Sequence, residues 1–185
     1  MQIIKCKGMV YRVSRSSIIG VGMFLLTLGC KDVVVLDKTT QFAISLDLYI
    51  EKDDTFEVYY TSSENEKYNR NQRVVTKVYG QPRKQKVEID LPEGVYPASL
   101  RLDFGTNRQQ EFIRLDDVEM HFGEVSVLEG LEEFRASFAP NAFIEAFSKA
   151  GEIRFMNSGN RYDPYFLSKP MFALKLEIIR KGIRH

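Results

Sequence analysis

The chain has 185 residues, of which 44% are hydrophobic, 12% aromatic and 28% charged. This is the composition of one folded domain, and it is too apolar for a disordered chain. The formal net charge is +1, but the first acidic residue is Asp32, so the chain that follows has a small acidic excess. Nucleic-acid-binding domains usually carry a basic excess, and no nucleic-acid partner is expected. Two cysteines, two histidines and no tryptophan argue against a disulfide framework, a zinc site or a Ser-His-Asp hydrolase.

Residues 1–29 have the organisation of an export signal. Arg12 and Arg15 precede an uncharged run whose apolar core, residues 18–28, is 11 residues long. A membrane-spanning helix needs about 20 apolar residues, so the run predicts a cleaved signal peptide. The protein starts at Met1 or at Met9, because either start leaves a complete signal.

The apolar core ends in Leu26-Thr27-Leu28-Gly29-Cys30, which resembles the lipobox of bacterial lipoproteins. In that family the cysteine is acylated and the chain is cut before it. The resemblance implies a signal peptide over 1–29, lipidation of Cys30 and a short tether over 30–41. The lipid bilayer is therefore the first expected partner. More than one acyl chain on Cys30 would make this anchoring stable. Lys31-Asp32 resembles the tags that send some lipoproteins outward, which favours the cell surface over the periplasmic face. The alternative is an internal apolar segment with a buried Cys30.

From residue 42 onward, hydrophobic and polar residues alternate, which is typical of half-buried strands. Residues 42–50 and 56–60, separated by an acidic turn, predict a hairpin. Helical spacing of Leu131, Phe134 and Phe138 predicts a short helix, and Pro140 opens a second one through Phe147. We therefore expect an all-β antiparallel sandwich over 42–185 with one or two short helices. The other predicted strands cover residues 74–79, 87–91, 100–102, 112–122, 153–156 and 172–178.

One passage carries a resemblance to known sandwich domains. Leu100-Arg101-Leu102-Asp103, a glycine turn at Gly105 and a return strand over 113–120 containing Leu115-Asp116-Asp117-Val118 are similar to the paired late strands of galactose-binding-like and carbohydrate-binding-module jelly rolls. The resemblance covers residues 42–122. It implies a jelly-roll fold and transfers no ligand-binding residue to this chain.

A sugar-binding face needs flat aromatic rings to stack on the sugar and planar polar groups to bind its hydroxyls. Residues 59–79 are rich in both, with a polar loop over 61–72. The alternative is that these tyrosines lie half-buried at the margin of the sandwich. The residues predicted to contact a glycan are Tyr60, Tyr68, Arg70, Arg73 and Tyr79.

Metal binding and catalysis have weaker support. Asp117 and Glu119 alternate onto one face of a strand and are weak candidates for a structural Ca²⁺. Solvated strand carboxylates are the favoured explanation of these residues, and no cofactor is expected. Glycoside hydrolysis needs a pair of carboxylates with one raised pKa, and the pattern singles out no pair. His121 falls inside a strand and His185 ends the chain, so no catalytic residue is predicted.

The sequence thus predicts a membrane-anchored, extracytoplasmic lipoprotein whose domain binds a ligand without chemistry. The hypothesised ligand is a glycan. The alternative is a structural or assembly lipoprotein that docks another cell-envelope protein through an apolar patch or a sheet edge, and a third hypothesis is a glycoside hydrolase.

Overall fold

The computed structural model describes residues 5–6, 9–10, 41–63, 65–156 and 162–182. The chain divides into two compact units, Met1–Lys31 and Asp32–His185. In the first, strand β1 (Lys5–Cys6) pairs antiparallel with β2 (Met9–Val10). The predicted apolar signal core and Cys30 lie outside the described residues. The second unit holds the sheets and helices.

One antiparallel sheet has six strands in the order β11-β12-β8-β3-β6, and β9 also pairs with β8. The long strands β3 and β8 form its centre and pair from Phe42 opposite Phe122 to Tyr49 opposite Arg114. The bounds of its strands are β3 Phe42–Ile50, β6 Gln81–Asp90, β8 Phe112–Phe122, β9 Val125–Glu129, β11 Ile144–Phe147 and β12 Glu152–Phe155.

The second antiparallel sheet has five strands in the order β10-β13-β7-β4-β5. Its neighbours come from distant parts of the sequence, since β13 pairs with β7 and β7 pairs with β4. The bounds of its strands are β4 Asp54–Thr61, β5 Arg73–Val78, β7 Ser99–Asp103, β10 Phe138–Pro140 and β13 Tyr165–Ser168.

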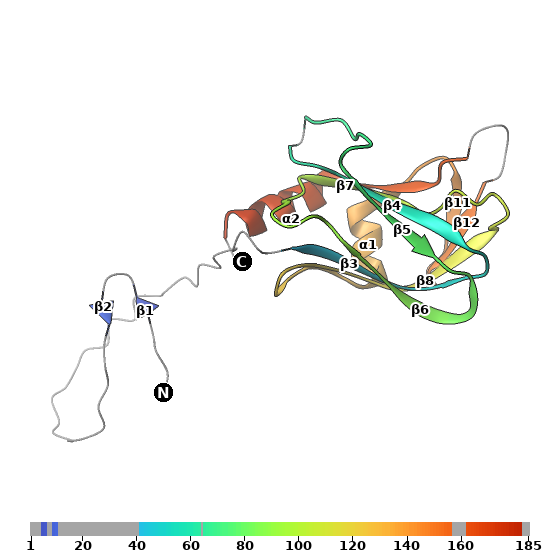
Figure 1. Cartoon of the computed structure of the whole chain (residues 1–185), viewed down its shortest axis with the longest axis horizontal. Helices are drawn as coiled ribbons and strands as arrows, with labels where there is room; N and C mark the ends of the chain where they lie inside the picture. The colour runs from blue at the N-terminus through green and yellow to red at the C-terminus, as the bar shows by residue number, and fades with distance from the viewer. Residues whose placement is uncertain (1–4, 7–8, 11–40, 64, 157–161, 183–185) are drawn as a thin grey trace, which may run out of the picture. The chain divides into compact units, whose positions relative to one another are not determined.

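The two sheets share one hydrophobic core, which is consistent with a β-sandwich (Figure 1). Alternation explains it: along β3 the residues Phe42, Ile44, Leu46, Leu48 and Ile50 are each at most 1% exposed, and the residues between them are half-buried. At about 25 cal/mol per Å² of apolar surface, burial of this kind is the main stabilising contribution. The chain passes from β5 in one sheet to β6 in the other at Gly80, where an added Cβ would lie 2.4 Å from the carbonyl oxygen of Glu51.

Two short helices are present in the described domain: α1 (Gly130–Ser137) and α2 (Pro170–Arg180). The predicted helix around Leu131 and Phe134 is therefore confirmed. Neither helix has the length and hydropathy needed to cross a bilayer. The helix predicted from Pro140 through Phe147 is wrong, because that segment forms β10 and β11. Proline is tolerated in β10 because this strand lies at a sheet edge.

The strand predicted over residues 172–178 is also wrong, because the segment is helix α2. Its apolar residues fit a period of two, but they fit a helical period as well. The buried residues Phe172 and Leu176 are four apart and lie on one helix face. The local signals for a helix were Pro170 at its first position and Gly182, with φ +70°, just after its end.

Two predicted strand pairings are corrected by the sheet order. β3 and β4 do not form a hairpin, since β3 pairs with β6 and β8 while β4 pairs with β5 and β7. Likewise β7 and β8, the two strands that carry the jelly-roll resemblance, lie in different sheets. In a sandwich, consecutive strands often cross between sheets, and a short turn is then compatible with either pairing. Strands β9 and β13 were not predicted.

Candidate functional site

The outer face of the five-stranded sheet carries a connected group of aromatic and charged side chains. Four adjacent strands and the segment before β13 contribute to it. We call it the tyrosine–arginine face, and it consists of Glu57, Tyr59, Arg73, Arg101, Asp103, Asp163 and Tyr165.

Strand register explains why these side chains meet. Tyr59 of β4 lies opposite Arg73 of β5 on one side and opposite Arg101 of β7 on the other. Asp103, two residues after Arg101, lies opposite Tyr165 of β13. Because side chains alternate along a strand, residues in these register positions point to the same face.

Arg101 is at the centre of this face. Its guanidinium carbon lies 3.8 Å from the ring centroid of Tyr165 and 5.3 Å from that of Tyr59. Its Nε and Nη2 donate to the two carboxylate oxygens of Asp103, each at 2.7 Å, and Nη2 also donates to Asp163 at 2.7 Å. A two-point guanidinium–carboxylate pair with aromatic stacking fixes the orientation of the arginine. These contacts hold the Arg101 guanidinium between the two rings.

A second set of contacts orders the side of the face near β5. Arg73 Nη1 donates to Glu57 Oε2 at 3.0 Å and to the Tyr59 hydroxyl oxygen at 3.0 Å. The Tyr59 hydroxyl donates to Glu57 Oε2 at 2.6 Å. Burial and the neighbouring Glu57 carboxylate raise the pKa of the Tyr59 hydroxyl, so this hydroxyl stays protonated at ordinary pH.

The carboxyl group of Asp103 has a perturbed protonation equilibrium. Its side chain is 11% exposed. Burial raises its pKa to about 6, with help from the Asp163 and Glu57 carboxylates and against the ion pair with Arg101, which lowers it. Perturbed groups cluster at functional sites, and this one lies in the middle of the face.

The five residues predicted to contact a glycan are brought together only in part. Arg73 belongs to the tyrosine–arginine face, and Tyr68 borders it by donating to Ser99 Oγ at 2.9 Å. Tyr60 is 8% exposed and belongs to the core, so its ring is not available on the surface. Arg70 is exposed in the loop, and Tyr79 is 66% exposed beyond the end of β5.

Sequence reasoning missed the centre of the face. In the sequence, Arg101 and Asp103 belong only to a strand pattern, and Tyr165 follows an Asp-Pro step that favours a turn. Alternation alone places Tyr59, rather than Tyr60, on the outer side, because Phe56 and Val58 face inward. That signal was available in the sequence, whereas the pairing of β4 with β7 and of β7 with β13 was not.

The segment Arg161-Tyr162-Asp163-Pro164-Tyr165 contains an Asp-Pro step, which favours an extended or turn conformation, with a tyrosine on either side. Its described part serves both the fold and the face. The Pro164 carbonyl oxygen accepts a hydrogen bond from the Phe104 amide at 3.0 Å. The Asp163 carboxylate accepts from the Arg101 guanidinium at 2.7 Å.

The weak Ca²⁺ candidates lie on the other sheet. Asp117 Oδ1 accepts from the Val118 amide at 2.9 Å, and Glu119 lies 3.8 Å from His121. The register of β3 and β8 shifts by one residue here, so Asp116 and Asp117 are both half-buried and neither enters the core. Among the described residues, no three His, Cys, Asp or Glu side chains are grouped closely enough to hold a metal ion.

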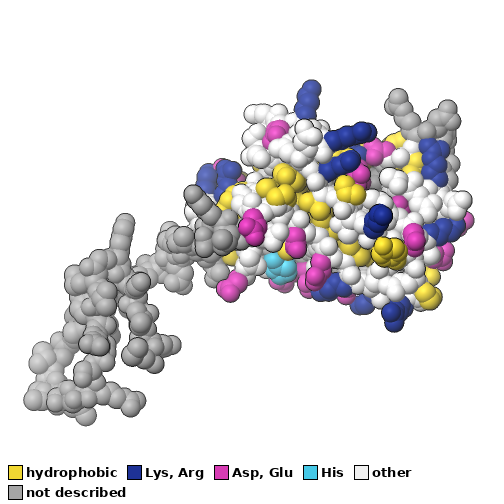
Figure 2. All heavy atoms as spheres, in the orientation of Figure 1, with side chains coloured by type: hydrophobic (Ala, Val, Ile, Leu, Met, Phe, Trp, Pro, Cys, Tyr) yellow, Lys and Arg dark blue, Asp and Glu magenta, His cyan; other side chains and the backbone are white. Residues whose placement is uncertain are grey.

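Charges on the surface are mixed. On the face shown in Figure 2, basic and acidic side chains of the described residues are interspersed among hydrophobic ones and are not gathered by sign.

Comparison with known proteins gives no match of the chain to a family model, to a curated protein or to a solved structure.

Proposed function

We propose that the protein is a lipid-anchored, extracytoplasmic lipoprotein whose jelly-roll-like domain binds glycans without transforming them. The anchor rests on the sequence: a basic start, an 11-residue apolar core over 18–28 and Gly29-Cys30 at its end. The same pattern with Lys31-Asp32 favours exposure at the cell surface. The bilayer then holds the domain through acyl chains on Cys30.

The glycan proposal is carried by one observation, the Arg101 guanidinium held against the rings of Tyr59 and Tyr165 on the outer face of the five-stranded sheet. Flat rings offer a surface for sugar C–H groups, and the guanidinium and carboxylates beside them offer planar hydrogen-bond partners. Ion pairs hold these groups in place, so little side-chain entropy is lost on binding. Such a face supports weak, orientation-specific binding of a polysaccharide segment.

Replacing Cys30 tests the anchor. We expect Cys30→Ser to move the protein from the membrane pellet to the soluble fraction, because the 11-residue apolar core is too short to hold it in a bilayer. Cys6→Ser is the matched control and should leave the protein in the membrane, since Cys6 precedes the predicted cleavage site. Mass spectrometry of the N-terminal peptide should show an acylated Cys30. An unmodified cysteine on soluble wild-type protein contradicts the anchor.

Affinity electrophoresis in polysaccharide gels, together with a glycan array, tests the ligand. We expect Tyr59→Ala and Tyr165→Ala each to weaken retardation about fivefold, the equivalent of losing about 1 kcal/mol of stacking. Tyr49→Ala is the control, because Tyr49 is a half-buried tyrosine on the other sheet that stacks on Phe112 with centroids 6.3 Å apart.

The same experiment separates the alternatives. If no envelope or dietary polysaccharide retards the wild-type protein, the glycan is abandoned in favour of a structural lipoprotein that docks an envelope protein. Release of reducing ends from a retarding polysaccharide would instead show a glycoside hydrolase and contradict the non-catalytic proposal.

A further inference from the structure

Helix α2 is apolar on two sides. Phe172 and Leu176 pack into the core at 1% and 4% exposure. Met171 and Leu174 remain 72% and 47% exposed, and Ile178 is half-buried one turn after Leu174. Residues three and four apart share a helix face, so Met171, Leu174 and Ile178 form a continuous apolar strip. Apolar helix faces are normally buried, yet in the described part of the chain Met171 and Leu174 of this strip remain largely exposed.

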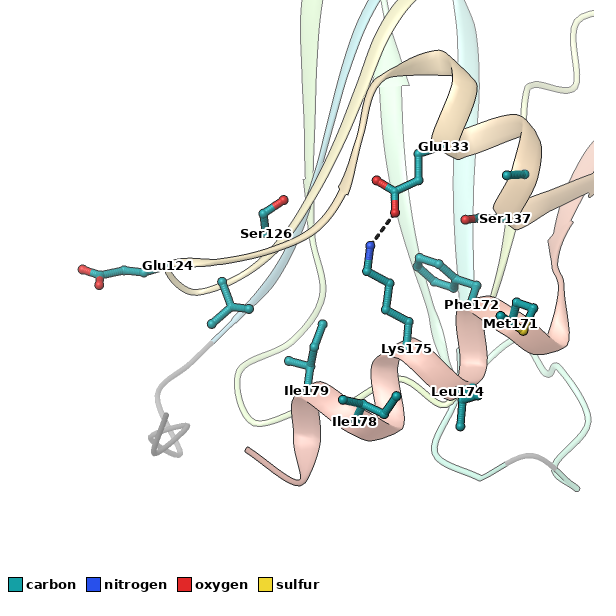
Figure 3. Close-up of a pocket in the computed structure, with 12 residues that line it drawn as sticks. Glu124, Ser126, Glu133, Ser137, Met171, Phe172, Leu174, Lys175, Ile178 and Ile179 are labelled. Atoms are coloured by element: carbon teal, nitrogen blue, oxygen red, sulfur yellow. Dashed lines mark hydrogen bonds and ion pairs between the residues drawn. The ribbon is translucent and has the colours of Figure 1, made fainter. Parts of the chain in front are cut away.

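The strip borders an open groove of about 770 Å³ between α1, α2 and the start of β9 (Figure 3). Figure 3 shows Lys175 of α2 reaching across it to an ion pair with Glu133 of α1. The β9 wall is made by Glu124, Val125 and Ser126. The walls are otherwise mainly apolar, so the groove and strip together form a surface suited to a nonpolar partner.

The chain enters the domain beside this groove. Gln41, the first described residue of the domain, accepts a hydrogen bond through its carbonyl oxygen from the Gly123 amide at 3.1 Å. Gly123 immediately precedes Glu124 and Val125 of the groove wall. Cys30 lies 11 residues before Gln41 in the sequence, a length of chain that spans at most about 36–40 Å when fully extended. An acylated Cys30 therefore keeps the groove end of the domain close to the lipid headgroups.

The charges on and around α2 suit a lipid surface. The segment 169–181 carries four basic residues, Lys169, Lys175, Arg180 and Lys181. Lys175 pairs with Glu133 of α1 and Lys181 with Glu177, which leaves two basic residues in excess. Long basic side chains extend from an apolar surface toward anionic headgroups, each adding about 1 kcal/mol near an anionic membrane. A short tether also gives the second contact a high effective concentration, in the millimolar range. Even a weakly lipophilic strip is then engaged.

We propose that α2 lies on the membrane to which Cys30 anchors the chain, with the strip Met171, Leu174 and Ile178 at the boundary between headgroups and acyl chains. The proposal rests on the lipid anchor proposed above. It gives the domain a fixed orientation: the groove end contacts an anionic bilayer, and the domain has two points of attachment to the lipid.

The chain contains no tryptophan, so a single introduced indole reports on one position. Leu174→Trp is prepared in the full, acylated protein and reconstituted in phosphatidylglycerol-containing vesicles with and without brominated acyl chains. We expect its emission to shift to shorter wavelength and to fall by at least about half with brominated lipid, because interfacial helices bury their apolar face about 5–10 Å into the boundary. Met171→Trp, at a more exposed position of the strip, should behave in the same way.

Val75→Trp is the matched control. Val75 is 50% exposed on β5, in the five-stranded sheet, and its emission should not respond to bromination. Flotation of the same vesicles reports the anchor separately. If the protein floats but neither strip tryptophan is quenched more than Val75→Trp, the membrane contact of α2 is overturned while the anchor stands, and the strip then fits an envelope protein. If the protein does not float, the anchor fails and the inference fails with it.

Discussion

Phe134→Ala is expected to lower the free energy of unfolding by about 4 kcal/mol, the usual cost of removing a fully buried phenylalanine. Phe134 is 0% exposed and is the one fully buried side chain of α1. Its removal therefore takes away the contact that holds α1 on the sheets. Urea unfolding followed by far-ultraviolet circular dichroism measures the change.

The size of the effect follows from the rings around Phe134. Its ring centroid lies 4.8 Å from that of Phe138, 5.2 Å from that of Phe166 and 6.0 Å from that of Phe147. The ring centroid of Phe166 in turn lies 5.5 Å from that of Phe104, the residue directly after β7. These rings come from α1 and from segments on both sheets, and a cavity at Phe134 would open where they meet. Close-packed interiors relax little around such a cavity.

Two variants calibrate the measurement. Phe134→Leu keeps most of the volume and should cost about 1–2 kcal/mol, and Val75→Ala, at a half-exposed position, should stay within about 0.5 kcal/mol. If Phe134→Ala destabilised the protein no more than Val75→Ala, α1 would not be docked as described.

Local alternation predicted two long strands correctly, although in β8 it is interrupted by the register shift at Asp116 and Asp117. The strands over 42–50 and 112–122 have the observed bounds, because one face of each is buried and a slip of one residue would expose it. The predicted helix around Phe134 is also correct. Between residues 172 and 178 the pattern fitted two periods, and the helix formed because Phe172 and Leu176 meet the core from one helix face.

The alternation of hydrophobic and polar residues does not determine which strands pair. Whether β3 pairs with β4 depends on how two sheets divide the strands, and each sheet takes neighbours far apart in the sequence. The candidate site has the same origin. Arg101 becomes a candidate site residue only because β4 and β13 pair with β7 and place Tyr59 and Tyr165 on either side of it. The cluster of tyrosine and arginine over residues 59–79 made these residue types the candidates for a site, and strand register decides which of them meet.

Gly151→Ala is expected to destabilise the protein by about 3 kcal/mol or more, through a backbone clash added to conformational strain. Gly151 has φ +85°, and an added Cβ would lie 1.8 Å from the carbonyl oxygen of Leu115. That contact cannot relax through a side-chain rotation, because the oxygen belongs to the backbone of Leu115. The Leu115 amide also donates to the Gly151 carbonyl oxygen at 2.9 Å, which keeps the two segments close. Relief requires β12 to move away from β8, the strand at the centre of the six-stranded sheet.

Gly130→Ala separates the two causes. Gly130 has a similar φ of +82°, but an added Cβ there would meet its nearest atom, Asp117 Oδ1, at 3.9 Å. In this variant only the backbone conformation is unfavourable, which lowers the free energy of unfolding by about 1–2 kcal/mol. Urea midpoints of the two variants should differ clearly, with Gly151→Ala the less stable. Equal midpoints would mean that the close approach of Gly151 to Leu115 contributes nothing, and that β12 is not held against β8 at this turn.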